Sequence, residues 1–98
     1  MLFAVRFYDR TDCANVRREY MPAHIAWLDE HRQMVLVGGS LRKEKGENPV
    51  GGLWLVEAPD KNAVEALISS DPFTIQGLRE NYEIFFWSKA FPERKASV

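Results

Sequence analysis

The chain has 98 residues, and 46% of them are hydrophobic, which is enough for one core and leaves no room for a second domain. Thirteen basic and fourteen acidic residues give a formal net charge of −1, with the two signs interleaved along the chain. Because nucleic acids and acidic membranes recruit basic patches, this balance disfavours both as partners, and we expect one domain over residues 1–98.

A change of hydrophobic spacing predicts the first two elements. Residues 2–8 are mostly apolar, β-branched or aromatic, and a turn-prone segment follows them, so we expect a strand. From Val16 onward, apolar side chains recur every three or four residues, which predicts a helix over about 15–33. Pro22 interrupts this pattern, and because proline removes a backbone donor we expect a kink there, or two helices that meet.

Two strands joined by a long connection follow. Residues 34–38 predict a second strand that ends at Gly38-Gly39-Ser40, and residues 52–58 predict a third strand with alternate side chains on opposite faces. The segment 41–51 carries a run of charged residues and then several Gly and Pro residues. We therefore expect a long, mobile hairpin loop between these strands.

The last third of the chain predicts a helix and a final strand. The Pro-Asp pair at 59–60 supplies a stop and a helix N-cap, and an amphipathic face follows over residues 63–68. The Asp-Pro pair at 71–72 ends this helix, and residues 82–87 predict the last strand. The order is therefore βαββαβ, an α+β ferredoxin-like arrangement with both helices on one face of a four-stranded antiparallel sheet.

The predicted strands are apolar on both faces. In the first strand, Leu2 and Ala4 point to one side, while Phe3 and Val5 point to the other. Two helices cover only one face of the sheet, and large exposed apolar patches are rare on monomers. We therefore expect a homodimer in which two sheets stack.

Several classes of site and location are disfavoured. The sequence contains no Gly-rich phosphate loop, zinc-helix motif or nucleophile elbow, and its one cysteine, Cys13, allows no intrachain disulfide or cysteine-rich zinc site. The start of the chain lacks the basic region of a signal peptide, and no apolar run reaches the roughly 18 residues of a membrane span. We expect a cytoplasmic protein with no metal site, and no cofactor is indicated.

The two histidines, His24 and His31, lie seven residues apart beside the apolar stripe of the first predicted helix, with Arg17 on the same line. A histidine in such a place is more often packed or capping than catalytic, and His31 near the helix C-terminus favours the negative end of the dipole. Asp71 has an equally plain interpretation as the N-cap of a short helix that starts at Pro72. Spacing alone therefore favours packing and capping roles.

Several short motifs nevertheless occur together between Leu2 and Trp87. They are Arg17, Pro22-Ala23-His24 with Trp27-Leu28, Gly38-Gly39-Ser40, and Asp71-Pro72-Phe73 with Gly77-Leu78. This combination resembles the YciI-like (YCII-related) family. The resemblance implies a ferredoxin-like domain that dimerises through its sheet as a dimeric α/β barrel. It also implies a His-Asp pair that lines a small pocket, carried here by His24 and Asp71, and some relatives act on chlorinated aromatic breakdown products.

A His-Asp pair performs acid–base chemistry, because a carboxylate bonded to one imidazole nitrogen makes the other a better proton acceptor near neutral pH. The resemblance makes His24 the general base or acid and Asp71 the group that orients it. The remaining candidates, as substrate contacts or pocket walls, are Arg17, Ser40, Tyr8 and Phe73. The expected activity is that of a cofactor-free lyase or isomerase for a small molecule, of dehydrochlorinase or muconolactone-isomerase type. Two alternatives stay open: a module that binds a small acidic ligand without turnover, and an accessory dimeric subunit.

Overall fold

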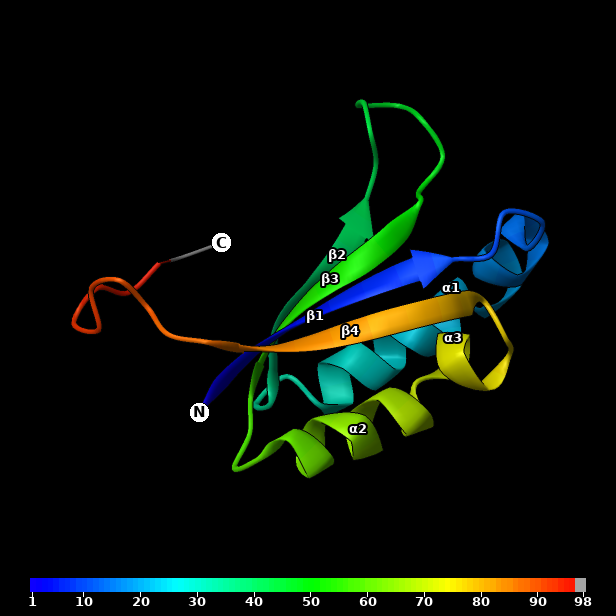
Figure 1. Ribbon diagram of the computed structural model, residues 1–98. Helices are drawn as coiled ribbons and strands as arrows, with labels where there is room; N and C mark the ends of the chain where they lie inside the picture. The colour runs from blue at the N-terminus through cyan, green and yellow to red at the C-terminus, as the bar shows by residue number, and fades with distance from the viewer. Residues whose placement is uncertain (97–98) are drawn as a thin grey trace.

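A computed structural model describes residues 1–96 and shows a four-stranded antiparallel sheet with helices against one face (Figure 1). The elements in chain order are β1 (Leu2–Asp9), α1 (Ala14–Glu30), β2 (Val35–Leu41), β3 (Gly51–Glu57), α2 (Lys61–Ser70), α3 (Pro72–Ile75) and β4 (Arg79–Trp87). The strand order is β2-β3-β1-β4. The predicted ferredoxin-like βαββαβ order is therefore confirmed, with the short α3 between α2 and β4.

α1 is one helix that runs through Pro22, so of the two predicted alternatives, a kink or two helices that meet, the second is wrong. Pro22 has no N–H to offer the carbonyl of Arg18. Both residues are exposed, so this break in the hydrogen bonding of the helix lies at the surface and not in the core. The helix ends at Glu30, three residues earlier than predicted. There the backbone N–H of His31 bonds back to two carbonyls of the last turn, and the chain then turns into β2.

β2 continues through Gly38-Gly39-Ser40 to Leu41, so the predicted stop at the glycines is wrong. Gly38 lies opposite Trp54 of β3, and a Cβ added at Gly38 would lie 3.1 Å from Trp54 Cδ1 and 3.3 Å from Leu28 of α1. The absent side chain thus makes room for the indole under α1, and no turn is involved. β3 starts at Gly51, one residue before the predicted boundary.

β4 begins at Arg79, three residues before the predicted start at residue 82. Its first residues are polar, which is unusual for a strand next to a hydrophobic core. They pair with the polar end of β1, where Arg79 lies opposite Asp9 across a register shift. Polar side chains therefore concentrate at this end of the sheet, and they belong to the candidate site described below.

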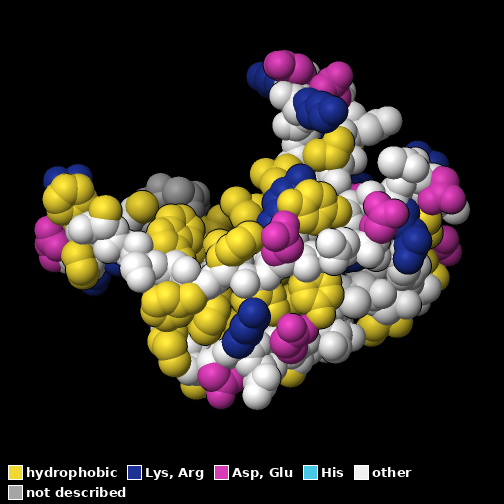
Figure 2. Space-filling model, viewed as in Figure 1, with side chains coloured by type: hydrophobic (Ala, Val, Ile, Leu, Met, Phe, Trp, Pro, Cys, Tyr) yellow, Lys and Arg dark blue, Asp and Glu magenta, His cyan; other side chains and the backbone are white. Residues whose placement is uncertain are grey.

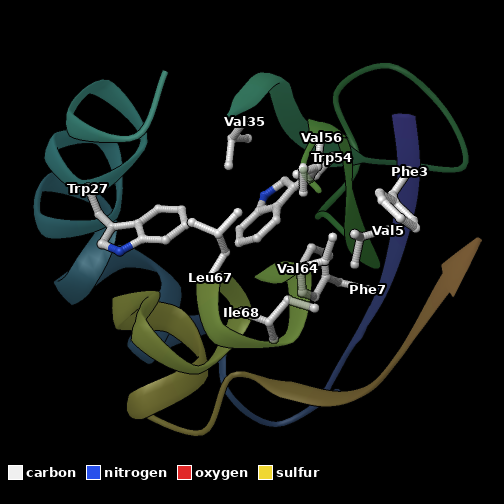
Figure 3. Packing of buried hydrophobic residues seen from close by; sticks show 11 residues of the cluster. Phe3, Val5, Phe7, Trp27, Val35, Trp54, Val56, Val64, Leu67 and Ile68 are labelled. Atoms are coloured by element: carbon white, nitrogen blue, oxygen red, sulfur yellow. The ribbon is translucent and has the colours of Figure 1, made fainter. Parts of the chain in front are cut away.

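The core lies between the sheet and the helices. Alternate residues of β1, namely Phe3, Val5 and Phe7, face the helices and are at most 4% exposed. Trp27 of α1 reaches toward Trp54 of β3, with ring centroids 5.2 Å apart (Figure 3). Each buried apolar side chain of this kind contributes about 1.5–3 kcal/mol, so this packing fixes α1 on the sheet.

The opposite face of the sheet is apolar and uncovered. Leu53, Phe85 and Trp87 on this face are 43%, 50% and 47% exposed. Hydrophobic side chains gather near β4 and the N-terminus, whereas the loop between β2 and β3 carries charged side chains at its tip (Figure 2). The predicted division of the strands into two apolar faces is confirmed.

Candidate functional site

His24 of α1 and Asp71, between α2 and α3, meet in the interior. Asp71 Oδ1 lies 2.6 Å from His24 Nδ1, and the two residues are 0% and 7% exposed. Phe73 stacks on the imidazole, with ring centroids 4.0 Å apart and planes inclined by 17°. The imidazole is therefore held by a hydrogen bond at one edge and by an aromatic ring on one face.

Asp71 is also the N-cap of α3, as the Asp-Pro pattern predicts. Its Oδ1 accepts a hydrogen bond from the backbone N–H of Phe73 at 3.3 Å, and Pro72 occupies the first turn of the helix. Its Oδ2 is buried and has no hydrogen-bond partner within residues 1–96. The capping interpretation and the pairing interpretation thus hold for the same oxygen, and the cap directs the carboxylate toward His24.

The hydrogen bond to Asp71 determines which nitrogen of His24 is available for chemistry. Since the carboxylate accepts at Nδ1, a neutral His24 carries its proton there and presents Nε2 as an acceptor. No hydrogen-bond partner for Nε2 is found in the described part of the chain, and the residue keeps a small exposed area. Nε2 is therefore the ring nitrogen of His24 that the described residues leave without a partner.

Asp9 at the end of β1 binds two arginines beside this pair. Its Oδ2 accepts from Arg17 Nη2 at 2.5 Å, and its Oδ1 accepts from Arg79 Nη1 at 2.7 Å. The side chains of Arg17, Asp9 and Arg79 are 13%, 5% and 5% exposed. Both guanidinium carbons lie 5.3 Å from the centre of the Phe73 ring, which also stacks on His24. The arginine cluster and the His-Asp pair therefore share one aromatic ring.

Burial lowers the pKa of the Arg79 guanidinium from its ordinary value, and the carboxylates of Asp9 and Asp71 oppose this effect. Arg79 Nε is buried without a hydrogen-bond partner among residues 1–96. The sequence predictions missed both Asp9 and Arg79. The available signal was an acidic residue that ends an apolar strand and a basic residue soon after Gly77, because antiparallel pairing places these two side chains opposite each other.

Two predicted site residues, Tyr8 and Ser40, do not reach the His-Asp pair. Tyr8 faces the other side of the sheet and does not line the pocket of His24 as predicted, because side chains alternate along β1. Its hydroxyl donates to Glu83 Oε1 at 2.8 Å, and this bond raises the pKa of Tyr8. Ser40 is exposed, and its Oγ accepts a hydrogen bond from Arg42 Nη1 at 2.5 Å.

His31 lies at the end of α1, where the sequence suggested a capping role. Its Nδ1 lies 2.8 Å from the carbonyl oxygen of Trp27, and its ring stacks on the Trp27 indole.

Desolvation and the hydrogen bond to Asp12 raise the pKa of the Cys13 thiol, which disfavours the nucleophilic thiolate. Within residues 1–96, no three His, Cys, Asp or Glu side chains are placed to hold a metal ion, and no helix is long and apolar enough to cross a membrane.

An open cavity of about 660 Å³ lies where the end of β1, the start of α1 and the loop between β2 and β3 meet. Arg17 and Pro22 line this cavity, whereas His24 and Asp71 do not. Arg17 connects the two regions, because it lines the cavity and also lies beside Phe73.

Comparisons with known proteins agree with this architecture. A search of curated proteins finds no significant match. The solved structure of 5-chloro-2-hydroxyhydroquinone dehydrochlorinase from Burkholderia phenoliruptrix, in complex with 2,5-dihydroxybenzoquinone, is similar with a TM-score of 0.81 and 29% identity, and the match covers 90% of this chain and 94% of that one. The cofactor-independent oxygenase SnoaB from Streptomyces nogalater is similar with a TM-score of 0.53 and 16% identity over 94% and 96% of the two chains, which shows a common fold alone.

The family follows from a match that is independent of these structures. The model of the YCII-related domain matches residues 1–88, nearly the whole length of the sequence. The matched segment contains every element of the fold and both residues of the His-Asp pair. The chain therefore belongs to the family of YCII-related domains.

Proposed function

We propose that this protein is a cofactor-free lyase or isomerase for a small molecule, with His24 as the general acid or base and Asp71 as the carboxylate that orients it. The observation that carries the proposal is the 2.6 Å contact between Asp71 Oδ1 and His24 Nδ1. A histidine that exchanges protons with a substrate needs a fixed tautomer and a second ring nitrogen without a partner. This contact fixes the tautomer and leaves Nε2 unoccupied. The similarity to a dehydrochlorinase at 29% identity supports a lyase reaction.

The chemistry of a dehydrochlorination suits a site built around one general base. The substrate loses one proton and one chloride. The carbon–chlorine bond breaks with its electron pair on chloride, and the electron pair left by the departing proton forms a new π bond. In our proposal, His24 Nε2 accepts the proton, and the Asp71 carboxylate stabilises the imidazolium that results. An isomerisation begins with the same transfer of a proton to His24 Nε2, but no leaving group departs; the π bond shifts, and the proton returns to a different atom.

The neighbouring side chains fit supporting roles. Phe73 fixes the plane of the imidazole by stacking, which limits the directions in which Nε2 points. Arg17 lines the cavity and is placed to bind an anionic oxygen of the substrate with its charged donors. Ser40 does not reach the His-Asp pair. It accepts a hydrogen bond from Arg42, which lines the cavity.

We also propose that the protein forms the homodimer that its family resemblance implies, with the uncovered faces of two sheets stacked. The exposed side chains of Leu53, Phe85 and Trp87 lie on this face and support the proposal. Apolar area of this kind is unfavourable in water at about 25 cal/mol per Å², so a second copy would stabilise it. The His-Asp pair lies on the helical side and stays outside the proposed interface.

The test is chloride release from 5-chloro-2-hydroxyhydroquinone by the wild type and by two variants. We expect His24→Asn to lower kcat by about 10²–10⁴-fold, the usual contribution of general acid–base catalysis. Asp71→Asn keeps an oxygen that accepts a hydrogen bond but loses the charge, so it should lower kcat as well. ¹⁵N NMR of the imidazole should show the proton on Nδ1 in the wild type and a larger share on Nε2 in Asp71→Asn.

The matched control is His31→Asn, which removes the other histidine of the same helix and should leave kcat unchanged. Equal loss in His31→Asn and His24→Asn would contradict the assignment of the base. A wild type that binds the compound without releasing chloride, together with full binding by His24→Asn, would instead favour the ligand-binding alternative.

A further inference from the structure

The cavity beside Arg17 concentrates positive charge in a chain whose formal net charge is −1. Four arginines, Arg10, Arg17, Arg18 and Arg42, line it together with a single acidic residue, Asp9. The lining therefore carries a net charge of +3. A concave surface lined by one sign of charge focuses the field and attracts small ions of the opposite sign.

Three of these cations, Arg10, Arg18 and Arg42, have no acidic partner within residues 1–96. Arg10 Nε donates to a backbone carbonyl at 3.1 Å. Arg42 donates to the backbone carbonyl of Glu47 at 2.8 Å and to Ser40 Oγ at 2.5 Å. Neutral acceptors orient a guanidinium without cancelling its charge, so Arg10 and Arg42 are held in place and still available to an anion.

The rest of the lining is largely apolar and includes Met21, Pro22, Pro49, Val50 and Leu78. A bare inorganic anion would leave this apolar surface in water, and an uncharged ring would leave the guanidinium groups without anionic partners. The volume of about 660 Å³ lies within the usual range of small-molecule sites. A ligand that suits both the apolar lining and the guanidinium groups is an apolar ring that carries more than one negative charge.

We infer that this cavity binds a ring-shaped organic dianion and that the preferred substrate of the proposed reaction is such a dianion. This statement rests on the proposed function, whose test compound is an uncharged phenol. Arg18 and Arg42 hold the charged groups at the outer part of the site. Arg17 lines the cavity and lies 5.3 Å from the centre of the Phe73 ring, which stacks on His24. In this inference, the reacting part of the same molecule extends past Arg17 to His24. The cavity and the His-Asp pair are then two halves of one substrate site.

The experiment is calorimetric titration with benzene-1,3-dicarboxylate as the probe. The test variant is Arg18→Gln combined with Arg42→Gln, and because both side chains are exposed, folding should be preserved. We expect the double variant to bind the probe at least 10-fold more weakly than the wild type and 200 mM salt to weaken wild-type binding. The matched control is Arg32→Gln, an exposed arginine outside the cavity that pairs with Asp29 and should leave the affinity unchanged.

Several outcomes would overturn the inference. One is equal affinity for the probe in the wild type and the double variant, and another is equal loss in Arg32→Gln. Binding of uncharged benzamide as tight as that of the dicarboxylate would refute the role of charge. Binding of inorganic phosphate as tight as that of the dicarboxylate would refute the role of the ring.

The result is also separable from the proposed function. His24→Asn should retain affinity for the dicarboxylate, because the dianion is held by the arginines. If His24→Asn abolishes chloride release while the double variant keeps its affinity for the dicarboxylate probe, the catalytic proposal stands and the cavity inference fails. If the probe binds as expected and His24→Asn releases chloride normally, the cavity inference stands and the catalytic proposal fails.

Discussion

Replacing Asp9 by alanine should destabilise the fold more than any other removal of a single charge in the described chain. Asp9 accepts hydrogen bonds from both Arg17 and Arg79, at 2.5 and 2.7 Å. All three side chains are at least 87% buried, so solvent screens these charges little. In Asp9→Ala, two cations would remain in the interior without a partner, next to an Nε of Arg79 that already lacks one.

The magnitude follows from the burial. Breaking a buried ion pair by removing one partner costs about 3–5 kcal/mol, most of it the penalty of an uncompensated charge. An exposed pair contributes about 0–1 kcal/mol, because water and salt screen it. Asp29 and Arg32 form such a pair at 3.4 Å, with side chains 74% and 76% exposed. We therefore expect Asp9→Ala to lower the free energy of unfolding by about 4 kcal/mol and Asp29→Ala by less than about 0.5 kcal/mol.

The assay is urea unfolding followed by tryptophan fluorescence, since Trp27 and Trp54 are buried in the core. All variants are compared at one protein concentration, because assembly adds to apparent stability. If the penalty is electrostatic, Asp9→Ala combined with Arg79→Leu should recover part of the loss. A cost for Asp9→Ala no greater than that for Asp29→Ala would refute the reasoning, and so would a double variant less stable by the full sum of the single changes.

Three further predictions concern the sheet. Gly51→Ala should lower the free energy of unfolding in urea by about 3 kcal/mol or more, because a Cβ there would clash with the backbone carbonyl oxygen of Phe7 in β1. A Cβ at Gly39 meets nothing within 4 Å, so Gly39→Ala should change stability by less than about 1 kcal/mol. Tyr82→Phe should cost about 1 kcal/mol at pH 7, since the Tyr82 hydroxyl donates to Glu65 at 2.6 Å. This bond raises the pKa of Tyr82 above its ordinary value of 10. The stabilisation is therefore fully present below the pKa of the unfolded chain, near 10, and should disappear as pH rises through the pKa of the folded protein. A cost of Tyr82→Phe that persists at high pH would contradict this. Phe85→Glu should yield monomers in sedimentation velocity if the proposed dimer exists, and an unchanged sedimentation coefficient would count against that interface.

The order of the elements could be predicted from the sequence, because apolar side chains recur with a spacing typical of a strand or of a helix within each main element. The boundaries could not, because they depend on side chains that only the folded chain brings together. Gly38 is typical of a turn by itself, yet Trp54 on the next strand and Leu28 on α1 make it the residue that fits inside a strand. The polar start of β4 pairs with the end of β1, where Arg79 lies opposite Asp9, and this pairing is not visible in the local sequence.

The candidate site was predictable to the extent that its members share a motif. His24 and Asp71 are 47 positions apart, and no local pattern says that they meet; the family resemblance supplied the pair, and the structure shows the contact. Tyr8 was expected to be a substrate contact or pocket wall, and alternation along β1 places it on the face of the sheet opposite to the core and the His-Asp pair. The arginines of the cavity come from separate segments and carry no signal until those segments meet.

The sequence Asp71-Pro72-Phe73 shows why capping and pairing are not competing interpretations. A carboxylate that orients an imidazole must itself be immobile, and the cap of α3 provides this, since the same Oδ1 that contacts His24 also accepts the N–H of Phe73. Pro72 restricts the backbone at the next position, and the ring of Phe73 then stacks on the imidazole that Asp71 binds. Three consecutive residues thus contribute to the orientation of His24: Asp71 accepts its hydrogen bond, Pro72 restricts the backbone between the other two, and Phe73 stacks on the imidazole. Separating these functions along the chain would require the fold to align each of them independently, so the short helix that looked merely structural in the sequence is the element that orients the proposed base.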